Sequence, residues 1–325
     1  MSLLNKARKS SLSGVVTRAG IVGAGRVGSA LARALRHAGA PVAVVYDQRF
    51  EVAETLAGEV GATAVKELGG LQGAVDELFV TTPDDEIHRT AAALAAEGVR
   101  VRVAAHLSGA LSSTILGPLA KAGAALASLH PIQTFRGEPE EWKLLARATF
   151  AVEGDELGLA WAEELVRGLG GEVIRLKTDQ KALYHATCSA ASNFLVSLWH
   201  LVEHMALQAG LTPVETRRVL IPLAERTLRN LAEAGPLLSL TGPIARGDVE
   251  TVRRQVEAVN AKVATRERTL FAELAEMTAD LAGDAGYLEP QTLEKVREVL
   301  RKIERNGLDV ETGSAFSAYL DAGEG

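Results

Sequence analysis

Four polar side chains recur at intervals of four residues in an otherwise apolar stretch, KALYHATCSAASNF (residues 181–194). They are an ammonium, an imidazole, a hydroxyl and an amide: Lys181, His185, Ser189 and Asn193. Side chains four positions apart lie on one face of an α-helix, so a helix here would align all four. Such groups donate protons and hydrogen bonds, as a carbonyl or imine requires when it accepts a hydride. The alternative is structural, with Lys181 extending to solvent from a helix start and His185 making a packing contact.

A partly buried lysine at the start of such a helix is a good proton donor near neutral pH. Burial disfavours the ammonium form and lowers the lysine pKa from about 10.4 toward neutrality. Lys181 would then act as the general acid, and His185 would relay or orient its proton. Ser189 and Asn193 would hydrogen-bond the polar groups of a substrate. This interpretation requires a hydride donor nearby.

A glycine-rich turn near the N-terminus separates an apolar run from an alanine-rich helix. Gly23, Gly25 and Gly28 form a G-x-G-x-x-G pattern. The first glycine permits a tight turn, the second lets a pyrophosphate approach the backbone, and the third lets helix and strand pack closely. Strand, helix and a following acidic residue stand where a dinucleotide site requires them. We therefore expect a dinucleotide at this turn, with Arg26 and Val27 contributing from the helix N-terminus.

The choice of dinucleotide depends on Asp47 and Arg49, which follow the next strand. Asp47 could accept hydrogen bonds from the adenosine ribose, which favours NAD. Arg49 could instead pair with a 2′-phosphate, which favours NADP. The residues alone leave both cofactors, NAD and NADP, open.

Further strands alternate with helices through the first half of the chain. We expect them at residues 76–82, 99–109, 124–130, 147–154 and 171–176. The alternation predicts an α/β fold: a Rossmann-type, doubly wound, mostly parallel sheet with helices on both faces, followed by an all-helical C-terminal domain.

Ligands of such sheets bind beyond the carboxyl ends of the strands, where several polar residues are expected. They are Thr81, Thr82 and Pro83 near the cofactor, and Ser108 and His130 near the nicotinamide or substrate. Pro83 and the following Asp84 also fit a strand stop with a helix cap, and Ser108 and His130 also fit ordinary polar strand ends.

Strand patterns end after residue 177, which predicts three regions. We expect a loose basic tail at 1–16, the dinucleotide-binding domain at 17–177, and a helical domain for substrate binding and dimerisation at 178–325. The first helix of the last region is expected to run from Thr178 to Gly210.

The helical region contains clear helix boundaries and one candidate anion ligand. Thr212 and Glu215 form a capping box, Gly235 ends a helix, and Asp248 caps the next one. Arg246 precedes that cap and could grip a substrate carboxylate with two hydrogen bonds. An exposed arginine on a structural loop is an equally good interpretation.

Composition excludes several classes of function. The 325 residues carry a net charge of −6, which gives no general attraction to nucleic acid or membrane. No apolar run approaches the roughly 20 residues of a membrane span. The single cysteine, Cys188, excludes an internal disulfide and favours a reducing cytoplasm. His200 and His204 have a zinc-ligand spacing, but no third ligand is evident, so no metal is expected.

Six segments together resemble a bacterial family of Rossmann-like proteins with a DUF2520 C-terminal domain. They are GAGRVGSAL, TPDDEI, HLSGALSS, SLHPIQTF, KALYHATCSAASN and TGPIARGD. The family looks like part of the 6-phosphogluconate dehydrogenase-like superfamily, which includes ketopantoate reductase, β-hydroxyacid dehydrogenases, prephenate dehydrogenase and pyrroline-carboxylate reductase. The resemblance implies an NADP- or F420-dependent oxidoreductase that dimerises through its helical domain.

The superfamily resemblance also implies site residues. Several members begin the helical domain with a catalytic lysine, followed four residues later by an asparagine. Lys181 matches that lysine, whereas His185 stands at the asparagine position and Asn193 is the candidate for the missing amide. HPIQTF is similar to the His-Pro-Met segment of prephenate dehydrogenases, which implies that His130 lines the nicotinamide pocket.

The predicted function is an NAD(P)-dependent oxidoreductase. It would transfer a hydride to or from a small anionic substrate, an oxo or hydroxy acid or an imine, in the interdomain cleft. One alternative is a redox sensor or regulator that binds NAD(P) without turnover. Another is a reductase in which a deazaflavin (F420) reduces NADP.

Overall fold

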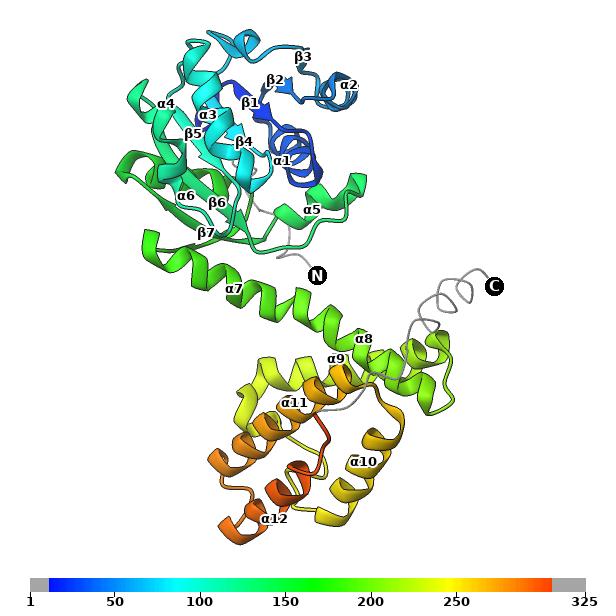
Figure 1. Cartoon of the computed structure of the whole chain (residues 1–325). Helices are drawn as coiled ribbons and strands as arrows, with labels where there is room; N and C mark the ends of the chain where they lie inside the picture. The colour runs from blue at the N-terminus through cyan, green and yellow to red at the C-terminus, as the bar shows by residue number, and fades with distance from the viewer. Residues whose placement is uncertain (1–11, 306–325) are drawn as a thin grey trace, which may run out of the picture. The chain divides into compact units, whose positions relative to one another are not determined.

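The computed structural model describes residues 12–305. The chain forms two compact units, Met1–Asn193 and Phe194–Gly325 (Figure 1). This division falls one helix later than the boundary expected after residue 177, because the helix that carries Lys181 packs on the sheet and belongs to the first unit.

The first unit is built on an eight-stranded sheet of order β3-β2-β1-β4-β5-β6-β7-β8. All neighbouring strands are parallel except β6 and β7, which are antiparallel. The strand order reverses between β1 and β4, the position at which such sheets bind ligands. The strands are β1 Ala19–Val22, β2 Val42–Tyr46, β3 Thr63–Val65, β4 Glu77–Val80, β5 Val103–His106, β6 Ala125–Pro131, β7 Thr149–Gly154 and β8 Glu172–Arg175.

Helices cover both faces of this sheet, which confirms the doubly wound α/β class. One hydrophobic core joins the sheet to α1, α2, α5 and α6, and another joins the opposite face to α3 and α4. The helices are α1 Arg26–His37, α2 Phe50–Val60, α3 Ile87–Ala96, α4 Gly117–Lys121, α5 Trp142–Leu145, α6 Glu156–Gly168 and α7 Lys181–Ala191. Short 3-10 turns are η1 Leu12–Gly14, η2 Leu68–Leu71, η3 Asp84–Glu86, η4 Ser113–Leu116, η5 Pro139–Glu141 and η6 Thr178–Gln180.

The segment at residues 12–16 is part of the core, so the expectation of a loose tail is wrong for these residues. Leu12 and Val16 are fully buried among the helices on one sheet face. The indole of Trp161 donates a hydrogen bond to the carbonyl of Val15. Residues 1–11 of the expected tail lie outside the described residues.

The second unit is helical, as expected. Its helices are α8 Asn193–Gln208, α9 Pro213–Ser239, α10 Val249–Lys262, α11 Thr265–Asp284 and α12 Pro290–Leu300, with Asn193 itself assigned to the first unit. Valines, alanines and leucines of α10, α11 and α12 form its core. Thr212 and Glu215 form the expected capping box, Gly235 interrupts α9 with φ 72°, and Asp248 caps α10.

The helix expected from Thr178 to Gly210 is divided in two. α7 ends at Ala191, and Ser192 leaves helical geometry with φ −125° and ψ −69° before α8 begins.

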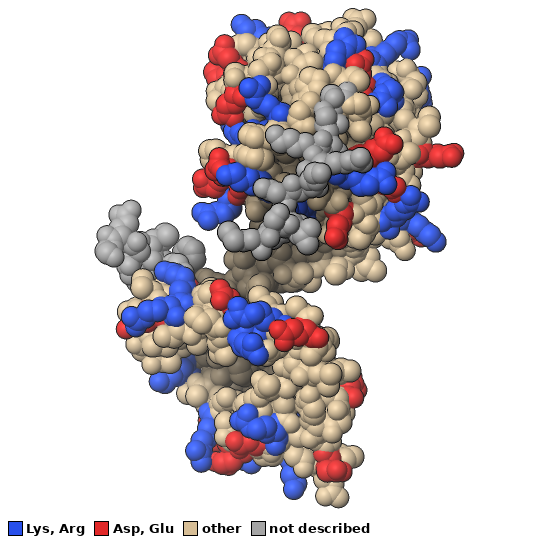
Figure 2. All heavy atoms as spheres, turned by 180° about the vertical axis from the view of Figure 1, so that it is seen from behind, with Lys and Arg blue, Asp and Glu red and all other residues tan. Residues whose placement is uncertain are grey.

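Acidic and basic side chains are interspersed over the face drawn in Figure 2. None of the helices in residues 12–305 is long and apolar enough to cross a membrane.

Candidate active site

The glycine-rich turn connects β1 to α1, and the structure explains each glycine. Gly23 has φ 104°, a conformation that side chains rarely adopt. A Cβ on Gly28 would lie 2.1 Å from the Gly23 carbonyl oxygen and 2.6 Å from Thr81 Oγ1. Gly25 has no atom within 4 Å of an added Cβ. The first and third glycines are therefore required by the backbone, whereas the second leaves the start of α1 open.

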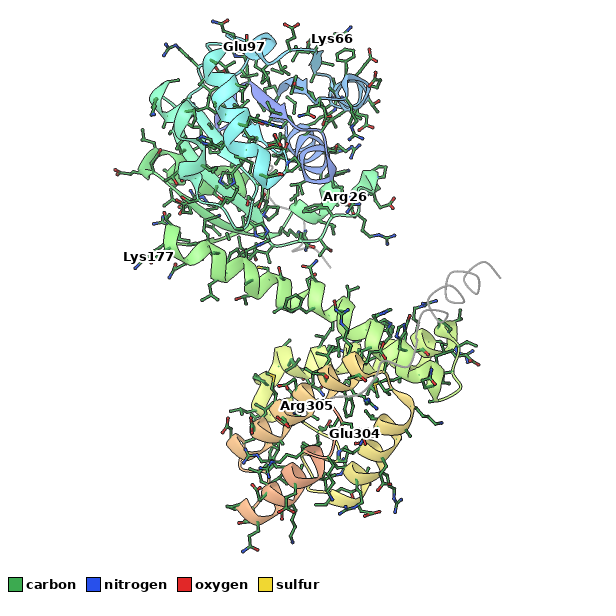
Figure 3. All side chains as sticks on the ribbon, viewed as in Figure 1. Arg26, Lys66, Glu97, Lys177, Glu304 and Arg305 are labelled. Carbon is green, nitrogen blue, oxygen red and sulfur yellow. The ribbon has the colours of Figure 1, made fainter. Side chains whose placement is uncertain are left out.

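A cavity of about 510 Å³ lies beside this turn, at the carboxyl ends of β1, β2 and β4. Thr82 lines it and has a buried Oγ1 without a hydrogen-bond partner among the described residues, a polar atom available to a ligand. Arg26, Val27 and Gly28 are not among its lining residues, although Arg26 begins α1 (Figure 3). The expected cofactor residues that line the cavity are Gly23, Gly25, Asp47, Arg49, Thr81, Thr82 and Pro83.

The Asp47 carboxylate holds the backbone of the glycine turn and that of its own loop after β2. Its carboxylate accepts hydrogen bonds from the N–H of Ala24 at 2.8 Å and the N–H of Arg49 at 3.0 Å. The Arg49 Nε lies 3.8 Å from the same carboxylate, and the Arg49 side chain is 73% exposed. Arg89 also lines the cavity. Glu86 lines the cavity as well and forms an ion pair with Arg89. The cavity therefore offers two carboxylates and two arginines to a ligand, and of the two arginines Arg49 is the one held only loosely by a carboxylate.

Lys181 projects from α7 onto the carboxyl ends of the strands and is only 1% exposed. Its Nζ lies 2.6 Å from Ser128 Oγ and 3.3 Å from the Ser108 carbonyl oxygen. Burial lowers the pKa of Lys181 to about 8, and the nearby carboxylates of Glu153 and Asp84 partly oppose this shift. Both the burial of the ammonium and the direction of its pKa shift agree with the sequence-based prediction.

Ser108 organises the turn that follows β5. Its hydroxyl donates to Asp84 Oδ2 at 2.7 Å and accepts the N–H groups of Ala110 and Leu111, each at 3.2 Å. Asp84 makes no side-chain cap at the start of η3, so the helix-cap interpretation of Asp84 is wrong. Ser108 thus supports the site through its backbone carbonyl and through the shape of the turn.

A second cavity, of about 360 Å³, lies at the end of β6 beside α7. Of the four residues spaced along the expected helix, Lys181, His185 and Ser189 lie on α7. The break at Ser192 places the fourth, Asn193, at the start of α8. Lys181 and Ser108 are not among the lining residues and lie deeper, at the strand ends. The site residues that line this cavity are His130, Tyr184, His185, Cys188, Ser189 and Asn193.

Two histidines near the strand ends are held neutral. The pKa of His130 and that of His106 are each lowered to about 4, chiefly because burial disfavours the imidazolium form. The His106 Nδ1 accepts the N–H of Ser108, and its Nε2 lies 3.1 Å from the Ser112 carbonyl oxygen. His106 is therefore a structural support of the β5 turn, whereas His130 reaches the cavity.

Sequence reasoning missed three polar residues of the site. The hydroxyl of Ser128 accepts a hydrogen bond from the ammonium of Lys181. Ser128 lies opposite Glu153 in the pairing of β6 with β7. Glu153 is buried and accepts hydrogen bonds from Ser113 and Thr178. The third residue, Tyr184, lies within the segment KALYHATCSAASNF. Glu153 and Ser128 are each a polar residue within a mostly apolar strand. That signal could have identified them, but strand prediction from apolar patterns ignores it.

Two other sequence motifs lie in the second unit. Arg246 is exposed on the loop between α9 and α10, and its carboxylate-binding role stays a prediction. The rings of His200 and His204 are 4.0 Å apart, and His204 Nδ1 lies 2.5 Å from Glu267 Oε1. Within residues 12–305, no three metal-binding side chains cluster.

Family models match both halves of the chain. A Rossmann-like domain matches residues 5–131, and a domain of unknown function, DUF2520, matches residues 148–278. The chain therefore matches a Rossmann-like domain followed by a DUF2520 domain. This confirms the family resemblance and places the start of the DUF2520 match before β7, within the unit that carries the sheet.

Solved structures share this fold along most of their length. Protein TM1727 from Thermotoga maritima is 26% identical, with 82% of this chain and 98% of that chain covered and a TM-score of 0.64. Protein BF3122 from Bacteroides fragilis is 18% identical, with 90% and 99% covered and a TM-score of 0.62. An imine reductase from Myxococcus stipitatus, in complex with NADP+, is 14% identical, with 93% and 99% covered and a TM-score of 0.55. No sequence among the curated proteins matches.

Proposed function

We propose that the protein is an NAD(P)-dependent oxidoreductase that reduces the C=O or C=N bond of a small anionic substrate. One observation carries the proposal. A buried ammonium, Lys181, stands at the same carboxyl edge of the sheet as the glycine turn and its cavity. Binding alone requires no buried ammonium at this edge, whereas reduction requires a proton source there.

The residues of the first cavity fit a nicotinamide dinucleotide. The open N-terminus of α1 at Gly25 suits a pyrophosphate, and the unpartnered hydroxyl of Thr82 offers a further hydrogen bond. The largely exposed guanidinium of Arg49 favours a 2′-phosphate, so NADP is the proposed cofactor. The NADP+ complex of the imine reductase with this fold supports the same choice.

A bound reduced nicotinamide supplies the hydride, and the chain supplies the proton and the orientation. As the substrate carbon accepts the hydride, its double-bond electron pair moves to the oxygen or nitrogen, which then takes a proton. Lys181 is the proposed proton source, because a pKa of about 8 makes its ammonium a better acid than an exposed lysine. His185 relays or orients that proton, while Ser189 and Asn193 bind the polar groups of the substrate.

The cofactor proposal is tested by titrating the protein with NADPH and NADH. Gly25→Val would place a side chain where the pyrophosphate binds, and the φ of −70° at this position suits valine. We expect this variant to lose dinucleotide binding and to keep its fold. Gly58→Val is the matched control, since Gly58 also has open space but lies on α2 and does not line the cavity.

If neither NADPH nor NADH binds the unmutated protein, the oxidoreductase proposal fails. If binding occurs, turnover is assayed by the loss of NADPH absorbance with a panel of oxo acids and cyclic imines. Binding without turnover of any of these acceptors would favour the alternative of a redox sensor.

A further inference from the structure

A tyrosine and a histidine from distant parts of the sequence form a half-buried pair at the second cavity. The hydroxyl of Tyr184, on α7, lies 2.8 Å from Nδ1 of His130, at the end of β6. The two rings meet edge to face at 82°, with centroids 5.6 Å apart. The hydroxyl therefore contacts the imidazole at one defined nitrogen, and the pair joins the helix to the sheet.

Both members of the pair are uncharged near neutral pH. The pKa of His130 is about 4, because burial disfavours the imidazolium and the charges of His185 and Lys181 oppose it, with only Asp84 favouring it. The pKa of Tyr184 is raised by burial and by the neighbouring Cys188, so the phenol keeps its proton. A neutral imidazole has one N–H and one unprotonated nitrogen, and the position of its proton depends on its partner.

The acidities of the two groups assign the phenol as the donor in this hydrogen bond. A phenol O–H is more acidic than a neutral imidazole N–H, and the unprotonated imidazole nitrogen is more basic than the phenol oxygen. The Tyr184 hydroxyl therefore donates to Nδ1 of His130, which leaves the imidazole proton on Nε2.

The surroundings of Nε2 depend on a glycine in the turn after β5. A Cβ at Gly109 would lie 2.9 Å from His130 Nε2 and 2.5 Å from a carbon of the His185 ring. Glycine at this position therefore lets both imidazoles pack against the turn. The His130 and His185 ring centroids are 5.6 Å apart, and both residues line the second cavity.

We propose that the Nε2–H of His130 donates a hydrogen bond to the oxygen or nitrogen of the substrate double bond, and that Tyr184 is the positioning residue that fixes this tautomer. The inference rests on the proposed function. Negative charge develops on that substrate atom as the carbon accepts the hydride, and a preorganised donor stabilises the charge. His130 keeps its proton throughout, and the proton that enters the product comes from Lys181.

The tautomer is measured directly by NMR of the full-length protein with ¹⁵N-labelled histidine. Long-range ¹H–¹⁵N correlation distinguishes a protonated from an unprotonated ring nitrogen, and the His130 signals are assigned from their loss in His130→Asn. We expect the Nε2–H tautomer at pH 7 in the unmutated protein. Tyr184→Phe should introduce the Nδ1–H tautomer, because the donor to Nδ1 is gone.

Thr187→Ala is the matched control. Thr187 also lines the cavity from α7, but its hydroxyl donates to the Leu183 carbonyl within the helix. It should leave the His130 tautomer unchanged, and thermal unfolding of each variant verifies its fold. An Nδ1–H tautomer in the unmutated protein, or an unchanged Nε2–H tautomer in folded Tyr184→Phe, would overturn the inference.

Kinetics test the part that depends on the proposed function. With NADPH and a reducible acceptor, loss of the His130 donor in His130→Ala should lower kcat by about 10²–10³-fold, as for other preorganised donors. Tyr184→Phe should lower kcat by less and leave KM nearly unchanged, since it keeps the aromatic ring at the cavity and removes only the hydroxyl that orients His130. Equal kcat values for Tyr184→Phe and the unmutated enzyme would refute the positioning role. A failure to bind NADPH would instead refute the proposed function and leave the tautomer result intact.

Discussion

At the scale of single residues, Lys181 is the most informative position, because an ammonium is rarely enclosed without a carboxylate in direct contact. Its hydrogen-bond partners are a hydroxyl and a carbonyl oxygen, from Ser128 and Ser108. Lys181→Met keeps the apolar stem and removes the charge. General acid catalysis typically contributes about 10²–10⁴-fold, so turnover should fall by that order while NADPH affinity stays nearly the same. Steady-state kinetics with a substrate from the panel, and a parallel NADPH titration, measure the two effects. Unchanged turnover would assign Lys181 a structural role.

The same residue predicts how reduction depends on pH. The ammonium is the acid, so the reductive kcat should decrease as the pH rises through the Lys181 pKa of about 8. The pH profile of kcat for the unmutated enzyme should show this decrease, and the profile of Lys181→Met should lack it. An identical decrease in both proteins would exclude Lys181 as the titrating group.

Stability should change with pH in the opposite direction. The pKa of Lys181 is about 8 in the folded protein, whereas an exposed lysine has a pKa of 10.5. Between these values the unfolded chain binds more protons than the folded one, so the contribution of Lys181 to the free energy of unfolding becomes more favourable as the pH rises. Urea unfolding at pH 8 and pH 10 should show a gain in the unmutated protein relative to Lys181→Met. The comparison cancels the other titrating groups, and a gain of zero would contradict the lowered pKa.

Cofactor choice is also a property of single side chains. Asp47 is engaged with two backbone N–H groups, whereas the guanidinium of Arg49 is largely exposed at the cavity. Arg49→Ala should weaken NADPH binding about tenfold, or ~1.4 kcal/mol, and barely change NADH binding. Arg33→Ala is the control, because Arg33 pairs with Glu59 and does not line the cavity. Equal losses for both dinucleotides in Arg49→Ala would remove the case for a 2′-phosphate contact.

At the scale of elements, the packing of α1 against the glycine turn decides whether the cofactor site forms. A Cβ on Gly28 would collide with the Gly23 carbonyl and Thr81 Oγ1. Gly28→Ala should destabilise the protein by about 1–3 kcal/mol, as overpacking usually does, and should weaken dinucleotide binding. Gly58→Ala, on α2, meets no atom within 4 Å and should stabilise by up to about 1 kcal/mol. Thermal unfolding of the two variants tests the pair, and equal melting temperatures would contradict the close approach.

At the scale of the whole molecule, the helical unit leaves much apolar surface uncovered. Val196 on α8 is 71% exposed and Leu223 on α9 is 63% exposed. A groove of about 350 Å³ between α8 and α11 is lined almost wholly by apolar side chains. We propose that this unit forms a homodimer, because two-fold dimers are the commonest closed assembly and such patches mark interfaces.

Light scattering at micromolar concentration measures the assembly. The unmutated protein should have the mass of a dimer, and Val196→Glu with Leu223→Glu should shift it toward the monomer. Leu157→Glu serves as the control, since Leu157 is 74% exposed on α6, in the first unit, and its change should leave the mass unaffected. A monomeric mass for the unmutated protein would be incompatible with the proposal.

The sequence by itself determined the features that depend on local periodicity and local backbone geometry. Alternating strand and helix patterns predicted the doubly wound sheet, and the spacing of Gly23, Gly25 and Gly28 predicted the turn at the first cavity. β3 (Thr63–Val65) was missed because three residues are too few to show a strand period. The break at Ser192 was missed because Ala191 and Asn193 fit a continuous helix equally well by pattern.

Only the tertiary structure decided which side chains meet at the site. Tyr184 contacts His130 across 54 positions, Lys181 contacts Ser128 across 53, and Ser108 contacts Asp84 across 24. Local sequence patterns carry no information about such pairs, because their contacts arise when parallel strands bring their carboxyl ends to one edge and α7 packs on it. The same packing desolvates Lys181 and His130, and burial is the main cause of both pKa shifts. The sequence identified Lys181 and His130 as candidate site residues, but the burial that lowers their pKa values arises only in the folded structure.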